Sequence, residues 1–147
     1  MRMMFHIRQR RWADCGVATI AMAAGVAYER VLESVAPDCF VHGLWSGEML
    51  HALLKITGRD WSHVEFDGET TLKDFDFPEG PAIVCIDRPE MAHYWARHYA
   101  VVADNVIYDP LLKQPLSLEE AKDDHHAAWR VVGLMTSGLV SSSSAKV

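Results

Sequence analysis

The chain has 147 residues, of which 50% are hydrophobic, and at this length one compact domain with a single core is expected. Its formal net charge of -6 argues against nucleic-acid binding, because proteins that bind a phosphate backbone usually carry a basic surface. No segment approaches the ~20 apolar residues that span a bilayer. The N-terminal segment also lacks the apolar core of a secretory signal. We therefore expect a cytoplasmic protein with neither a nucleic-acid nor a membrane partner.

The first half of the chain is predicted to be mostly helical. The clearest segment runs from Asp14 to Ala24, with Asp14 as the expected N-cap and Gly25 as the terminating residue. Apolar residues lie on almost every side of this segment, which predicts a central helix surrounded by protein. Two further helices are predicted at residues 28–35 and 46–57.

The second half is predicted to be mostly sheet. Five short runs rich in β-branched or aromatic residues are bounded by turn-forming residues, at positions 61–66, 82–87, 98–103, 106–109 and 129–134. Ser117 and Glu120 have the spacing of a capping box, which predicts a short helix between the last two strands. Helices followed by strands indicate an α+β domain, expected to cover residues 1–137. The serine-rich residues 138–147 are predicted to form a disordered tail.

Cys15 stands at the head of the predicted central helix. Unpaired backbone N–H groups and the positive end of the helix dipole favour a thiolate there, and the thiolate is the reactive form of cysteine. Gly16 follows, and its missing side chain would let a substrate backbone pass close to the sulfur. Cys39 and Cys85 lack such a position and are predicted to be structural. The three cysteines are too far apart to suggest a disulfide framework or a zinc site.

A predicted hairpin joins a histidine to an aspartate. The two strands are separated by Asp104 and Asn105, which tolerate the positive φ of a two-residue turn. The register that follows makes His98 and Asp109 diagonal neighbours on one face of the sheet. The carboxylate can then hold one ring nitrogen while the other faces a thiol, as in a catalytic triad. His93 is a rival base, but no strand register brings it to a carboxylate.

Four of these residues occur in an order that resembles a known family. Gln9-x5-Cys15, then His98 at the start of an apolar strand, then Asp109-Pro110 resemble the double-glycine peptidases of bacteriocin processing. The resemblance implies a papain-like fold, in which N-terminal helices pack on a C-terminal antiparallel sheet and the central helix carries the nucleophile. It also implies that Gln9 completes the oxyanion hole beside the N–H of Cys15, because a tetrahedral oxyanion requires prepositioned donors. The best-known members are N-terminal domains of exporters, whereas a stand-alone domain is expected here.

Together these residues predict a cysteine peptidase that hydrolyses a peptide or isopeptide bond through a thioester acyl-enzyme. The resemblance implies cleavage after glycine, and the expected partner is a peptide or protein substrate with no cofactor. Two alternatives stay open: transfer of the acyl group to an amine instead of water, and a peptide-binding or inhibitory protein that keeps the fold without cutting. The sequence does not define the substrate or the oligomeric state.

Trp12 and several histidines are further candidates for the site. Trp12 lies between the candidate oxyanion residue and the nucleophile and is a candidate for substrate binding, although ordinary packing is the commoner role of such aromatics. The histidines show no recognised metal-ligand spacing, so no metal is predicted. Asp123, Asp124, His125 and His126 are predicted to lie in a polar loop without a chemical role.

Overall fold

The computed structural model describes residues 4–11, 13–37, 43–90 and 97–137. The predictions made for Trp12, Cys39, His93 and residues 138–147 lie outside this part of the chain. Its helices are α1 (Cys15–Ala24), α2 (Tyr28–Leu32), α4 (Ser46–Thr57), α5 (Leu118–Ala121) and the 3-10 helix η2 (His125–Ala128). Its strands are β1 (Trp61–Glu65), β2 (Ala82–Asp87), β3 (Arg97–Ala103), β4 (Val106–Tyr108), β5 (Leu116–Ser117) and β6 (Arg130–Ser137).

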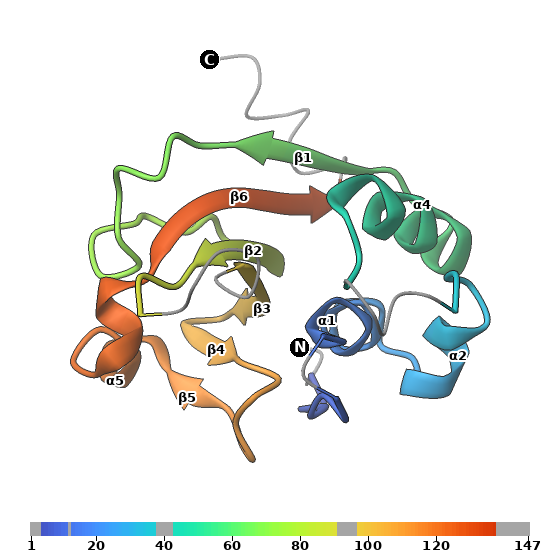
Figure 1. Ribbon diagram of the computed structural model, residues 1–147, viewed down its shortest axis with the longest axis horizontal. Helices are drawn as coiled ribbons and strands as arrows, with labels where there is room; N and C mark the ends of the chain where they lie inside the picture. The colour runs from blue at the N-terminus through green and yellow to red at the C-terminus, as the bar shows by residue number, and fades with distance from the viewer. Residues whose placement is uncertain (1–3, 12, 38–42, 91–96, 138–147) are drawn as a thin grey trace.

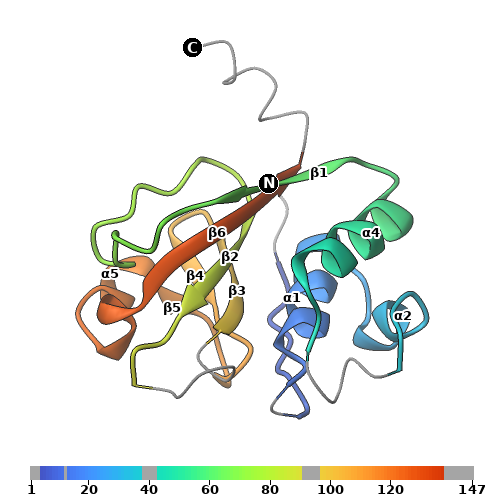
Figure 2. The same cartoon turned by 45° about the horizontal axis from the view of Figure 1, so that its top comes forward.

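The strands form one antiparallel sheet in the order β1-β6-β2-β3-β4-β5. Helices α1, α2 and α4 pack together on one side of it, and the short α5 lies at the opposite end of the molecule (Figure 1). Turned by 45°, the same arrangement separates into a helical half and a sheet half that meet along α1 (Figure 2). The predicted α+β class is therefore confirmed. Within the described ranges, no helix has both the length and the apolar character needed to cross a membrane.

Helix α1 is the central helix that the sequence predicts. Every residue from Gly16 to Met22 is buried, and the helix contacts α2, α4, β2 and β3. It ends at Gly25, whose φ of 72° is the left-handed conformation that a glycine adopts without strain. The first residue of α1, Cys15, thus lies where the helical half meets the sheet.

The hairpin between β3 and β4 has the predicted register. Ala103 pairs with Val106 and Val101 with Tyr108, and the two turn residues, Asp104 and Asn105, have φ values of 51° and 63°. Strand β4 is shorter than β3, so the first half of β3 extends beyond it, and α1 packs beside β3. This leaves room for a helix end next to the beginning of β3.

Some element boundaries differ from those predicted. The second helix stops at Leu32, three residues early, and β6 continues to Ser137 because it pairs with β1 on one side and with β2 on the other. The capping box of Ser117 and Glu120 is confirmed. Strand β5 and η2 were not predicted, since two-residue strands and single 3-10 turns carry too little periodic pattern.

Candidate active site

Cys15 is a free, partly buried thiol at the start of α1. Burial raises its pKa, but the positive charge of His98 and a hydrogen bond with that side chain lower it. The backbone N–H of Tyr99 and the charge of Arg88 lower it further, and the net result is a pKa below the ordinary value of 9.0. The structure therefore favours the thiolate form of Cys15, which is the nucleophilic form.

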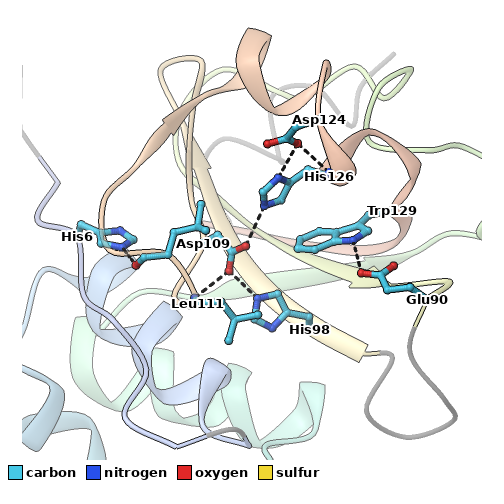
Figure 3. A network of polar contacts seen from close by, with 9 residues as sticks. His6, Glu90, His98, Asp109, Leu111, Asp124, His126 and Trp129 are labelled. Carbon is cyan, nitrogen blue, oxygen red and sulfur yellow. Dashed lines mark hydrogen bonds and ion pairs between the residues drawn. The ribbon is translucent and has the colours of Figure 1, made fainter.

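His98 and Asp109 are joined by a buried hydrogen bond. Nε2 of His98 lies 2.7 Å from Oδ1 of Asp109, and the two side chains are only 2% and 1% exposed (Figure 3). The predicted diagonal contact across the hairpin is confirmed. Because Asp109 binds Nε2, the other ring nitrogen, Nδ1, is the one left to interact with Cys15.

The surroundings of His98 and Asp109 favour a protonated His98 beside a thiolate at Cys15. Burial lowers the pKa of His98, but the charge of Cys15 and the hydrogen bond with Asp109 raise it, to about 9. Burial raises the pKa of Asp109, yet hydrogen bonds from His126, His98 and the N–H of Leu111 hold it well below its usual range. Asp109 is thus a permanent carboxylate at neutral pH.

The turn after β4 holds the Asp109 carboxylate in place. The N–H of Leu111 donates to Oδ1 at 3.0 Å, and the N–H of Leu112 donates to the backbone carbonyl of Asp109 at 2.9 Å. Between them, Pro110 accepts a hydrogen bond from the N–H of Gln9 at 2.9 Å. This last bond ties the loop before α1 to the turn that carries Asp109.

Gln9, the predicted oxyanion residue, lies in that loop. Its side-chain Nε2 donates to the carbonyl of Arg11 at 2.6 Å, while its Oε1 is buried and has no hydrogen-bond partner. An amide nitrogen carries two hydrogens, so one donor remains beside the bond to Arg11. The predicted role of Gln9 at an oxyanion stays a prediction.

Asp14 occupies the N-cap position of α1 but does not cap the helix, which corrects the prediction. Its carboxylate accepts instead from the backbone N–H groups of Arg10 (3.0 Å) and Arg11 (2.9 Å) and from the Tyr28 hydroxyl. The side chain therefore folds the preceding loop and does not occupy the first-turn N–H groups of α1. Those groups point toward the end of the helix where Cys15 lies.

Gly16 is buried against Leu44. A Cβ added at position 16 would lie 3.2 Å from Cβ of Leu44, which is a tight contact. The absence of a side chain at position 16 therefore allows close packing against Leu44, a reason that the sequence alone does not reveal. Its predicted part in substrate binding stays a prediction.

His126, which was predicted to lie in a polar loop without a role, lies instead in η2 and contacts Asp109. His126 is 0% exposed, and its Nε2 lies 3.0 Å from Oδ2 of Asp109. Its Nδ1 lies 2.8 Å from Oδ1 of Asp124 (Figure 3). No local pattern places His126 beside Asp109, because the contact depends on how β5, α5 and η2 return to the sheet.

Ligand atoms of Asp124, His125 and His126 lie within 4.8 Å of one another, which raises the question of a metal. Both ring nitrogens of His126 are already bound to carboxylates, so a metal would have to displace one of these bonds. Hydrogen bonding therefore accounts for the contact of His126 with Asp124 without an ion.

A groove of about 770 Å³ lies elsewhere, near the C-terminal end of α1. Its lining includes Met22, Val26, Trp61 and Pro81, and none of the residues around the Cys15 thiol belongs to it. The groove is thus separate from the cluster of Cys15, His98 and Asp109.

No protein-family model matches the chain, and no similarity to a curated protein was found. Its function has to be inferred from the chemistry of the described side chains.

Proposed function

We propose that this protein is a cysteine peptidase of papain-like architecture, with Cys15 as the nucleophile, His98 as the general base and acid, and Asp109 as the residue that orients His98. The observation that carries the proposal is the buried 2.7 Å bond between His98 and Asp109, next to a thiol whose pKa is lowered by the same histidine. A helix that begins at the cysteine and a hairpin that carries the other two residues support the papain-like arrangement.

The proposed reaction has two steps. The Cys15 thiolate attacks the carbonyl carbon of a peptide bond, the His98 imidazolium gives its proton to the departing amine, and a thioester remains on the enzyme. Water then attacks the thioester carbon while neutral His98 accepts one of its protons, and the C–S bond breaks. The products are a carboxylic acid and the free thiolate beside a protonated His98, which is the starting state.

The oxyanion formed in each step needs donors that already point at it. The backbone N–H of Cys15 and the side-chain amide of Gln9 are the proposed donors. The hydrogen bond of the Gln9 backbone to Pro110 supports this assignment, since it fixes the Gln9 loop relative to the turn that carries Asp109. We also propose that the substrate has glycine at the cleavage site, following the resemblance to double-glycine peptidases.

Free thiols at Cys15 and Cys85 are compatible with a reducing compartment, and we propose that the enzyme acts in the cytoplasm. In the proposal, residues 1–137 form the peptidase domain and the substrate is a peptide or protein. No cofactor takes part in either step.

The test is digestion of a peptide library rich in glycine pairs, carried out in oxygen-labelled water with an added amine and analysed by mass spectrometry. Hydrolysis puts labelled oxygen into the new carboxyl group, and Cys15→Ala abolishes the cleavage while Cys85→Ala leaves it intact. Amide products formed with the added amine would identify an acyltransferase instead. Peptides that bind to the protein and are released uncleaved would identify a binding protein and contradict the proposal.

A further inference from the structure

His126 makes two hydrogen bonds to two different carboxylates. Nε2 lies 3.0 Å from Oδ2 of Asp109, and Nδ1 lies 2.8 Å from Oδ1 of Asp124. The same Asp124 oxygen accepts from the backbone N–H of His126 at 2.8 Å. Ring and backbone of His126 are thus both held by Asp124, on the far side of the ring from Asp109.

These contacts favour one protonation state of the ring. An ionised carboxylate has lone pairs and no hydrogen, so each ring nitrogen that faces one must carry the proton itself. Both nitrogens of His126 face carboxylates, and a ring with two N–H groups is an imidazolium. Two charge-assisted bonds on a fully buried ring are stronger than the bonds that a neutral histidine would make.

Two carboxylates and two aromatic rings surround the His126 ring. Asp109 and Asp124 face its two nitrogens, and the His125 ring lies 4.1 Å away, centroid to centroid. Trp129 packs edge to face against it at 4.4 Å and donates its Nε1–H to Glu90 at 3.2 Å. Arg88 lies over the same Trp129 ring, with its guanidinium carbon 6.0 Å from the ring centroid.

The same Trp129 ring also packs edge to face against His98, at 5.8 Å. Asp109 and Trp129 therefore both contact the two histidines, one by hydrogen bonds and the other by ring packing (Figure 3). A change in the position of His126 would be passed to His98 through these two shared neighbours.

We propose that His126 is a positioning residue of the active site: as an imidazolium held by Asp124, it fixes the Asp109 carboxylate and thereby the direction in which His98 faces Cys15. This inference rests on the proposed cysteine chemistry and adds two positioning residues, His126 and Asp124.

The need for such a residue follows from the burial of Asp109. Oδ1 is satisfied by His98 and by the N–H of Leu111, whereas Oδ2 has His126 as its side-chain partner. Asp109 is 1% exposed, so loss of this partner would leave a buried anionic oxygen without its donor. The carboxyl group would respond by rotating or by taking up a proton, and either response weakens the bond to His98.

The pKa shifts are consistent with this assignment. Burial lowers the pKa of His126, but its hydrogen bonds to Asp109 and Asp124 raise it above the ordinary value of 6.5. Of the interactions that lower the pKa of Asp109, the hydrogen bond from His126 has the largest effect. The imidazolium and the carboxylate stabilise each other's charged form.

Two variants separate positioning from simple packing. His126→Phe keeps a ring against Trp129 but has no donor for Asp109, whereas His126→Gln places an amide N–H at about the reach of Nε2. Asp124→Asn is a third variant, on an exposed side chain whose amide oxygen can still accept the backbone N–H of His126. Thermal unfolding of each variant shows whether it is folded.

The readout is the pH profile of Cys15 alkylation by iodoacetamide, followed by site-resolved mass spectrometry, together with nitrogen NMR of isotope-labelled histidine. In the wild type we expect His126 to be doubly protonated at about pH 7. We expect His126→Phe to slow alkylation about tenfold at about pH 6, and His126→Gln to restore most of the rate. In Asp124→Asn, His126 loses its second proton at a lower pH than in the wild type.

The outcomes distinguish this inference from the proposed function. If Cys15 of the wild type titrates as an ordinary thiol, the proposed function fails and the positioning role fails with it. If the wild-type thiol is reactive at low pH and the His126→Phe profile is unchanged, only the positioning role is overturned. A neutral His126 ring at about pH 7 would also overturn it, even if His126→Phe did not fold.

Discussion

Two thiols in this protein, Cys15 and Cys85, experience opposite shifts although burial acts on both in the same direction. Cys85 lies within β2, is 4% exposed, and has a pKa raised to about 11, mainly by burial. Cys15 lies at the start of α1 and has a lowered pKa, because the charge and hydrogen bond of His98, together with the N–H of Tyr99 and the charge of Arg88, outweigh burial. The difference shows that a buried thiol becomes a thiolate only where its partners together outweigh the effect of burial.

A nearby cation alone does not produce this effect. Arg97 lowers the pKa of Cys85 through its charge and a hydrogen bond, yet burial still prevails there. Cys85 also has a favourable hydrogen bond with the Tyr99 side chain, and burial still prevails. At Cys15 the charge and hydrogen bond of His98 act together with the N–H of Tyr99 and the charge of Arg88, and their sum exceeds the effect of burial. Single substitutions test the comparison between the two thiols.

Replacement of His98 by alanine has the largest expected effect. Cys15 stays buried but loses the charge and hydrogen bond of His98, so its pKa rises toward the raised pKa of Cys85. Each unit of pKa changes the thiolate fraction tenfold at low pH, and we expect alkylation of Cys15 at about pH 6 to slow roughly a hundredfold. Site-resolved mass spectrometry after iodoacetamide treatment measures the rate. An unchanged Cys15 rate would show that His98 is not its partner.

Asp109→Asn has an intermediate effect. Asp109 raises the pKa of His98 through its hydrogen bond and its charge, so its loss lowers that pKa from about 9. The imidazolium is then lost at a lower pH than in the wild type, and alkylation of Cys15 at about pH 6 slows about tenfold. Nitrogen NMR of labelled histidine gives the His98 titration directly. A midpoint that stays near the wild-type value would mean that the carboxylate charge has little influence on His98.

Cys85→Ala has the smallest effect on the reactive thiol. Since its pKa is about 11, Cys85 is uncharged at neutral pH and contributes no field at Cys15. We expect the Cys15 alkylation rate to change less than about twofold, and the free energy of unfolding to fall by about 1 kcal/mol from the lost packing. Alkylation kinetics and denaturant unfolding measure the two quantities. A large loss of Cys15 reactivity would indicate that the two thiols are coupled.

Local patterns in the sequence were enough to predict part of this site. Cys15 was placed by the helix that begins at it, and the contact of His98 with Asp109 followed from the two-residue turn at Asp104 and Asn105. Both depend on neighbours in the chain or on one hairpin. The α+β class could be predicted for the same reason, because helical and strand periodicities occupy different halves of the sequence.

The remaining parts depend on long-range geometry. Aspartate is a common N-cap residue, but the preceding loop turns back toward Asp14. Its carboxylate therefore accepts from the N–H groups of Arg10 and Arg11. His126 reaches Asp109 only after the chain has passed through β5, α5 and η2. Neither arrangement leaves a periodic or local signal, so both required the three-dimensional structure.

The most direct test of the central claim is the pH dependence of iodoacetamide alkylation of Cys15 and Cys85 in the same sample of the wild-type protein. We expect Cys15 to react rapidly below about pH 7, where an ordinary thiol is almost fully protonated, and Cys85 to stay unreactive until strongly alkaline pH. Unfolding the protein should then bring both to the profile of an ordinary thiol. If the two cysteines have the same profile in the folded protein, Cys15 is not activated and the proposed peptidase mechanism is wrong.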